Sequence, residues 1–172
     1  MSILNSLDEF IKSYQKVEKI MLAGTIENKK QFMSLLLKGT SFDRLLVRSV
    51  TLRTSVLFEI DCTLDKNWFD AGEAENMEKY ALWSDIKPVI FELIKGHKLP
   101  GYMKIILSPA SMATEKIHNN AAALFININF ENNILTITTG CSEKIFSMDR
   151  SVERIWDEYA SKFFKNNGII LE

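Results

Sequence analysis

Two carboxylates on one predicted strand are the first residues of this sequence whose spacing could support chemistry. Glu59 and Asp61 are two positions apart, so on an extended chain they share one face, about 7 Å apart. Such a pair could bind a metal ion or act as general acid and base. A tight turn near residues 53–54 would instead place Arg48 opposite Glu59 and Arg44 diagonal to Asp61. We expect these cross-strand ion pairs to account for both carboxylates.

A basic cluster surrounds a glycine at the end of a predicted helix. Lys95, His97 and Lys98 flank Gly96, and Lys87 lies further back in the same helix. Two ammonium groups, an imidazole and a flexible glycine could bind an anion such as a phosphate. Cations at a helix C-terminus also complement the helix dipole, which explains the cluster without any ligand. Neither common glycine-rich phosphate-binding pattern occurs in the sequence, so a role in binding an anion or nucleic acid rests on the charge cluster alone.

A polar segment that is predicted to form a hairpin loop holds a cysteine and a serine. Cys141 or Ser142 could act as a nucleophile if a base lay within hydrogen-bonding distance. The only histidines are His97 and His118, and nothing in the sequence places either of them near this loop. We therefore expect Cys141, Ser142 and Lys144 to form a contact loop. The two histidines and two cysteines match no zinc-binding spacing, so we expect no metal and no other cofactor.

The best candidates for an exposed aromatic surface are Trp68 and Phe69. They lie in an acidic run, because residues 61–80 carry six acids against Lys66 and Lys79. A run of this kind is usually a solvated loop or helix face. Two consecutive aromatic residues beside it would offer a partner surface with apolar area.

The composition is typical of a soluble globular protein. The chain has 172 residues, of which 47% are hydrophobic and 25% charged, and its net charge is −1. A nucleic-acid-binding protein would usually show a basic excess. No apolar run approaches the roughly 18 residues needed to cross a membrane, and charges interrupt the N-terminal segment too often for a signal peptide. We therefore expect a cytoplasmic protein with no membrane association and with Cys62 and Cys141 as free thiols.

Apolar periodicity and cap signals predict an α+β fold. The expected helices cover residues 1–16, 27–37 with a left-handed end at Gly39, 84–95 and 108–118, and a C-terminal helix starts after Asp149 and ends at 166–168. The expected strands are 17–22, 42–53, 55–63, 102–107 and a three-stranded meander of 124–130, 134–139 and 144–148, with turns at 131–133 and 140–143. We expect one domain over residues 1–172, with residues 1–16 as an N-terminal helical extension. Its mostly antiparallel sheet has about six strands, and four to five helices pack on one face, those at the two ends of the chain being amphipathic.

Four segments together resemble an uncharacterised bacterial family of unknown function: FMSLLL (32–37), FDRLLVRSVTLRTSVLFEIDCTL (42–64), LWSDIKPVIFELIKG (82–96) and FININFENNILTITTGCSEKIFSMD (125–149). The resemblance runs from about Val17 to Phe164 and implies no activity. The region from Leu82 to Met148 also resembles a DNA sliding-clamp repeat, through Ile94-Lys-Gly96, Thr139-Gly-Cys-Ser142 and Phe146-Ser147. That resemblance implies self-association and contacts between lysines and DNA phosphates, made by Lys87, Lys95, Lys98 and Lys104.

Three functions remain open from the sequence. The favoured one is a non-catalytic interaction or regulatory module that contacts a protein partner through a sheet edge or a helix face. The second is a sliding-clamp-like protein that forms homo-oligomers and binds DNA with marked salt sensitivity. The third is a small hydrolase-type enzyme that uses Glu59 with Asp61, or Cys141 with Ser142. An enzyme would require convergent side chains with perturbed pKa values in one pocket.

Overall fold

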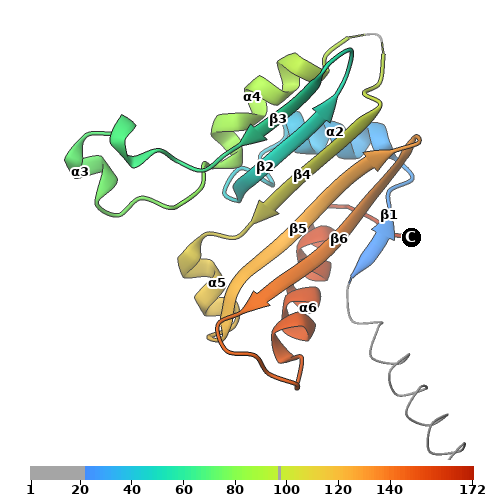
Figure 1. Ribbon diagram of the computed structural model, residues 1–172. Coiled ribbons are helices and arrows are strands. Elements are labelled where there is room, and N and C mark those ends of the chain that lie inside the picture. Colours follow the sequence, from blue (N-terminus) through green and yellow to red (C-terminus); the bar gives the residue numbers. More distant parts are fainter. Residues whose placement is uncertain (1–21, 97) are drawn as a thin grey trace, which may run out of the picture.

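The structure, a computed structural model, describes residues 22–96 and 98–172 and is built on one six-stranded antiparallel sheet (Figure 1). The strands lie in the order β1-β6-β5-β4-β2-β3. They are β1 (Ala23–Thr25), β2 (Leu46–Arg53), β3 (Leu57–Asp61), β4 (Tyr102–Ser108), β5 (Ala121–Glu131) and β6 (Ile134–Glu143). The helices are α2 (Lys29–Lys38), α3 (Ala71–Ala74), α4 (Trp83–Ile94), α5 (Ser111–Ile117) and α6 (Ser151–Asn166), with a short 3₁₀ turn η1 (Lys66–Trp68). The α+β prediction is confirmed, and the predicted helix over residues 1–16 lies outside the described residues.

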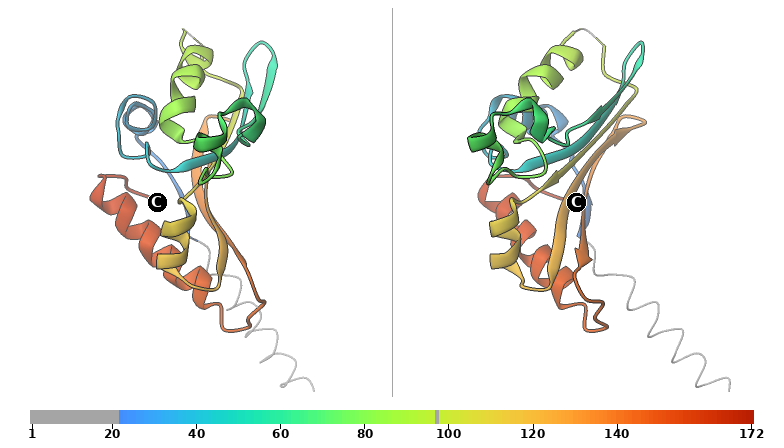
Figure 2. Two further views of the ribbon diagram at one scale, coloured as in Figure 1. Left: turned by 90° about the vertical axis from the view of Figure 1, so that its left-hand side faces the viewer. Right: turned by 60° about the vertical axis from the view of Figure 1, so that its left-hand side comes forward.

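One face of the sheet forms the core. Along β5 the buried residues Leu124, Ile126 and Ile128 alternate with the half-buried Phe125 and Asn127, because successive side chains of a strand point to opposite faces. Figure 2 shows α2, α4, α5 and α6 on one side of the sheet, where they cover the buried residues. The residues of the opposite face remain in contact with solvent, and most of them are polar: Ser49, Thr51, Lys104, Asn127, Asn129, Thr136 and Thr138.

The C-terminal segment shields the β1 edge of the sheet. The Thr25 N–H donates to the Glu172 carbonyl at 2.8 Å, and the Glu172 N–H donates to the Thr25 carbonyl at 3.1 Å. An added Cβ at Gly24 would lie 2.7 Å from the Cβ of Leu171, so this close approach requires glycine. The backbone groups of β1 are therefore paired rather than left open to another chain.

The predicted third strand of the meander is wrong. The chain does not turn at residues 140–143, because Gly140 and Cys141 stay in register with β5 and β6 runs on to Glu143. Residues 144–148 form the loop that leads to α6. The reversal predicted at residues 131–133 is confirmed: Asn132 and Asn133 have φ of 50° and 62°, as a tight hairpin turn requires.

Several predicted element ends also shift. Gly39 ends α2 in an extended conformation (φ −75°, ψ 178°) rather than the predicted left-handed one. Helix α4 starts at Trp83, earlier than predicted, so Pro88 lies inside it and one backbone hydrogen bond of the helix is lost. Helix α5 starts at Ser111, after the proline that was expected to open it. The strand predicted at 42–53 starts only at Leu46, because residues 41–44 form a turn.

Candidate functional site

The two carboxylates of β3 are exposed and are not paired with arginine. A three-residue loop, 54–56, joins β2 to β3, so Glu59 and Asp61 face two hydroxyl residues of β2. The predicted pairs of Arg48 with Glu59 and of Arg44 with Asp61 are therefore wrong. These two ion pairs were predicted from a tighter turn. The longer loop changes which residues of β2 and β3 lie opposite each other.

Asp61 forms a local turn instead. Its Oδ1 accepts hydrogen bonds from the Thr63 hydroxyl at 2.7 Å and from the Thr63 N–H at 2.9 Å. These two bonds, the hydroxyl first, lower the pKa of Asp61, because they stabilise its ionised form. A carboxylate that is held ionised is a poor proton donor. Among the described residues, no group of three or more histidine, cysteine or acidic side chains is arranged to hold a metal ion.

Arg48 occupies a bulge on the open face of the sheet. The register of β2 against β4 shifts between Val47 and Ser49, so Arg48 is the extra residue of β2. Its Nε donates to the hydroxyl of Ser108 at 3.2 Å, and its Nη1 donates to the hydroxyl of Tyr80 at 3.3 Å. The guanidinium carbon lies 4.5 Å from the ring centroid of Tyr80 and 4.7 Å from that of Phe125. Two aromatic rings and two hydroxyls thus fix the guanidinium plane.

This half-buried guanidinium has no acidic partner in the part of the chain that the structure describes. Among the described residues, no carboxylate lies within 4.0 Å of Arg48. The two nearest acids that line the same pocket are engaged elsewhere. Glu78 accepts from the N–H and the hydroxyl of Ser111 at 2.9 and 2.7 Å, and Glu115 accepts from Lys144 at 3.3 Å. Arg48 therefore keeps donor capacity for an anion from outside.

The pocket beside Arg48 has a volume of about 350 Å³. It lies where β4 ends and β5 begins, and Arg48, Lys79 and Lys144 contribute three cationic groups to its lining against the two acids. A planar guanidinium with free N–H groups can bind a carboxylate or phosphate through two parallel hydrogen bonds. The buried hydroxyl of Ser108 and the ring of Phe125 hold the guanidinium ready for such a ligand.

Two of the lysines in the predicted basic cluster already have acidic partners. Lys87 donates to the Gly39 carbonyl at 2.7 Å and pairs with Asp43. Lys95 pairs with Glu92 on its own helix, and both side chains are exposed. Lys98 is exposed in the following loop, and His97 lies outside the described residues. The anion-binding role predicted for these four residues stays a prediction.

Cys141 lies on β6 rather than in a loop, and its environment keeps the thiol protonated. Burial raises the pKa of Cys141 to about 11, and Glu153, Glu143 and Asp157 add to the increase. His118 is engaged elsewhere, because its ring nitrogens contact the Ser151 hydroxyl and the Asn120 N–H, both at 3.1 Å. Ser142 is exposed on the same strand, and Lys144 follows in the loop to α6.

Trp68 stands at a loop that projects from the body of the molecule (Figure 1). Hydrogen bonds between residues 62–64 and 79–81 close the base of this loop. The side chain of Trp68 is 85% exposed, and Phe69 is half-buried. The same loop carries Tyr80 and Glu78 to the pocket at Arg48. The predicted aromatic residues and two residues at the arginine pocket therefore belong to the same loop.

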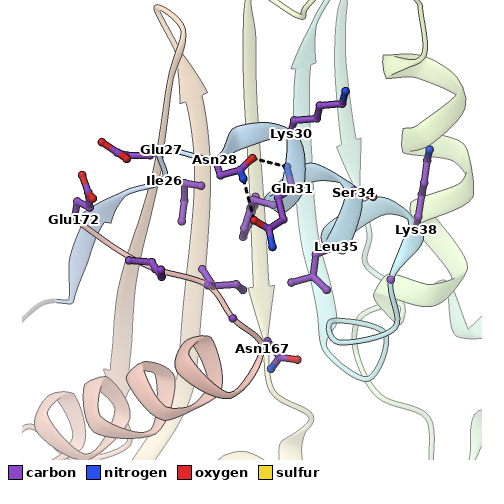
Figure 3. A pocket seen from close by; sticks show the side chains of 15 residues that line it. Ile26, Glu27, Asn28, Lys30, Gln31, Ser34, Leu35, Lys38, Asn167 and Glu172 are labelled. Atoms are coloured by element: carbon purple, nitrogen blue, oxygen red, sulfur yellow. Dashed lines mark hydrogen bonds between the residues drawn. The ribbon is translucent and has the colours of Figure 1, made fainter.

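Another groove lies between α2 and the C-terminal segment (Figure 3). It measures about 910 Å³. Its polar residues satisfy one another: the Asn28 amide donates to Gln31 Oε1 at 3.0 Å, and the Gln31 N–H donates to Asn28 Oδ1 at 3.1 Å. Glu27 and Glu172 lie together at its rim, and their contact raises the pKa of the Glu172 carboxyl. Lys30 and Lys38 also line this groove, but none of the described residues that line it is an arginine, so it offers no guanidinium for two parallel hydrogen bonds.

Fold and site thus define an α+β protein with one covered and one open sheet face and an unpaired arginine on the open face. The chain belongs to the family of unknown function DUF5721, whose sequence profile matches residues 35–172. This match confirms the predicted family resemblance, whereas the bacterial origin and the sliding-clamp resemblance stay predictions. No curated protein and no solved structure matches the chain. Among the described residues, no helix is both long and apolar enough to cross a membrane.

Proposed function

We propose that this protein is a non-catalytic binding module that holds a carboxylate of a protein partner at Arg48. The observation that carries the proposal is a half-buried guanidinium without a carboxylate among the described residues. Burying a cation without a counter-ion costs free energy, and the two rings and two hydroxyls offset only part of that cost. An anionic group of a partner would complete the pairing.

The charges around the pocket favour a carboxylate over a nucleic acid. Residues 61–80, which supply one wall of the pocket, carry six acids against two lysines. A polyanion would meet this acidic loop, whereas a single acidic side chain would not. Lys87 and Lys95, which would have to contact DNA, already pair with Asp43 and Glu92.

Trp68 supports a protein as the partner. Exposed tryptophans contribute large apolar area at low entropic cost and dominate many protein interfaces. Trp68 lies in the loop that also carries Tyr80 to the pocket. A partner that binds this loop at both ends would contact Trp68 as well as the pocket at Arg48.

The test is a titration of the full chain with N-acetylglutamate, followed by NMR at the Arg48 Nε–H. We expect millimolar binding that shifts this signal. Arg48→Gln should weaken binding by about 10-fold or more, because it removes charged hydrogen bonds worth roughly 1.5–3 kcal/mol. Arg48→Lys should bind less well than wild type, because the ammonium lacks the planar fork. Arg53→Gln, on the same strand but exposed, is the matched control and should change affinity less than 2-fold.

Parallel titrations with inorganic phosphate and with a 20-base-pair duplex separate the alternatives. Equal losses in Arg48→Gln and Arg53→Gln would refute a specific site. Salt-sensitive duplex binding tighter than carboxylate binding would replace the proposal with the DNA-associated alternative. Circular dichroism and urea unfolding of each variant would show whether a loss of binding reflects a loss of folding.

A further inference from the structure

A second cavity lies at the opposite end of the strands from Arg48, on the helix-covered face. It measures about 560 Å³. Met33 and Leu37 of α2 form one wall, Leu99 and Pro100 form another, and the floor reaches core residues such as Met103. Cavities of 300–1,000 Å³ with mostly apolar walls are the usual size and character of small-molecule sites.

The mouth of this cavity leaves an apolar side chain in water. Leu99 is 74% exposed, although it lines a cavity whose other apolar residues are largely buried. Lys98 immediately precedes it and is also exposed. An apolar ligand would cover Leu99 together with the cavity walls, and removing this apolar surface from water would favour binding.

The rim of the cavity carries free positive charge. Lys29 Nζ donates to the Asn133 carbonyl at 2.7 Å and to the Asn133 Oδ1 at 3.3 Å. These two hydrogen bonds leave one of the three protons of the Lys29 ammonium for a ligand. Among the described residues, no carboxylate lies within 4.0 Å of Lys29 or Lys30. Lys30 and Glu27 line both this cavity and the neighbouring groove of Figure 3, where Glu27 lies beside Glu172.

We propose that this cavity binds an amphipathic carboxylate, with an alkyl chain against Met33, Leu37 and Leu99 and its head group at Lys29 and Lys30. The argument is one of complementarity, because the walls are mostly apolar and the charged residues that line the cavity are two lysines against one acid, Glu27. The site is separate from Arg48 and does not depend on the function proposed there.

The test uses calorimetric titration of the full chain with decanoate, decanol and decyltrimethylammonium, each below its micelle concentration. We expect decanoate to bind at least 10-fold more tightly than either of the other two. Lys29→Glu with Lys30→Glu should reduce decanoate affinity 10-fold or more and change decanol affinity less than 2-fold. Leu99→Glu should weaken both ligands. Lys162→Glu, an exposed lysine of α6, is the matched control and should have no effect.

Three results would overturn the proposal. The first is equal affinity for the anionic and the cationic ligand. The second is unchanged decanoate binding in Leu99→Glu, provided that this variant unfolds cooperatively in urea. The third is decanoate binding that appears only after deletion of residues 1–20, or only on dilution to a monomer. In those cases the N-terminal segment or a second copy of the chain would be the occupant.

Discussion

The protonated state of Cys141 yields a quantitative prediction about its reactivity. Its pKa is raised from 9.0 to about 11. At pH 8 this shift reduces the thiolate fraction from about 10% to about 0.1%, a factor of about 100. A more basic thiolate is also a better nucleophile, with a Brønsted coefficient of about 0.4–0.5, which returns a factor of roughly 10. Cys141 should therefore react about 10-fold more slowly at pH 8 than an ordinary thiol.

The assay is the rate of reaction with 4,4′-dithiodipyridine from pH 7 to 10.5, in a Cys62→Ala background and with glutathione as the reference thiol. The logarithm of the rate should rise by about one per pH unit up to pH 10, where the rate for glutathione has already levelled off. Glu153→Gln should increase the rate at pH 8, because it removes a negative charge that opposes ionisation. A plateau below pH 9, or a rate above that of glutathione, would refute this reasoning. It would also restore Cys141 as a candidate nucleophile.

Three further predictions concern stability, measured by urea unfolding. Trp83→Phe should lower the free energy of unfolding by about 2–4 kcal/mol. The buried indole donates to the Leu36 carbonyl at 2.9 Å, and its removal leaves a buried acceptor and a small void. The exposed control Trp68→Phe should change the free energy of unfolding by less than about 0.5 kcal/mol. Gly24→Ala should lower the free energy of unfolding by about 1–3 kcal/mol, because the new Cβ would collide with Leu171. An unchanged urea midpoint would show that the C-terminal segment does not pack against β1. The pKa values of Cys62 and Cys141 are both raised from 9.0 to about 11. The contribution of the two thiols to stability should therefore be constant below pH 9 and fall as pH rises toward 11. Replacing both cysteines with alanine should reduce that fall.

Elements with strong periodicity could be predicted from the sequence. In α6, Val152, Trp156, Ala160 and Phe164 recur every four residues, and all four are buried. The β5 alternation and the asparagine turn after it were equally clear, because each is set by neighbouring residues. The end of β6 was not predictable in this way. Its polar residues 140–143 are typical of a turn, and only their pairing with β5 keeps them in the sheet.

The candidate site was missed for a related reason. Arg48 interrupts the apolar pattern of β2 between Val47 and Val50, which is a signal of a bulge in that strand. Composition does not reveal whether a hairpin contains a one-residue bulge or a three-residue loop. Each of these irregularities nevertheless changes which side chains lie opposite each other. The arginine was therefore assigned to Glu59, while the structure places it between Tyr80 and Phe125.

The sequence by itself determined the fold class and the alternation of buried and exposed residues, because local periodicity and composition carry that information. The family followed from the resemblance of four sequence segments and from the match to its profile. Only the tertiary structure decided which charges are paired. Lys87 and Lys95 have acidic partners, whereas Arg48 and Lys29 have none within residues 22–96 and 98–172. Pairing depends on register and on distances between segments far apart in the chain, and hydrophobic patterning fixes neither of them to within one residue.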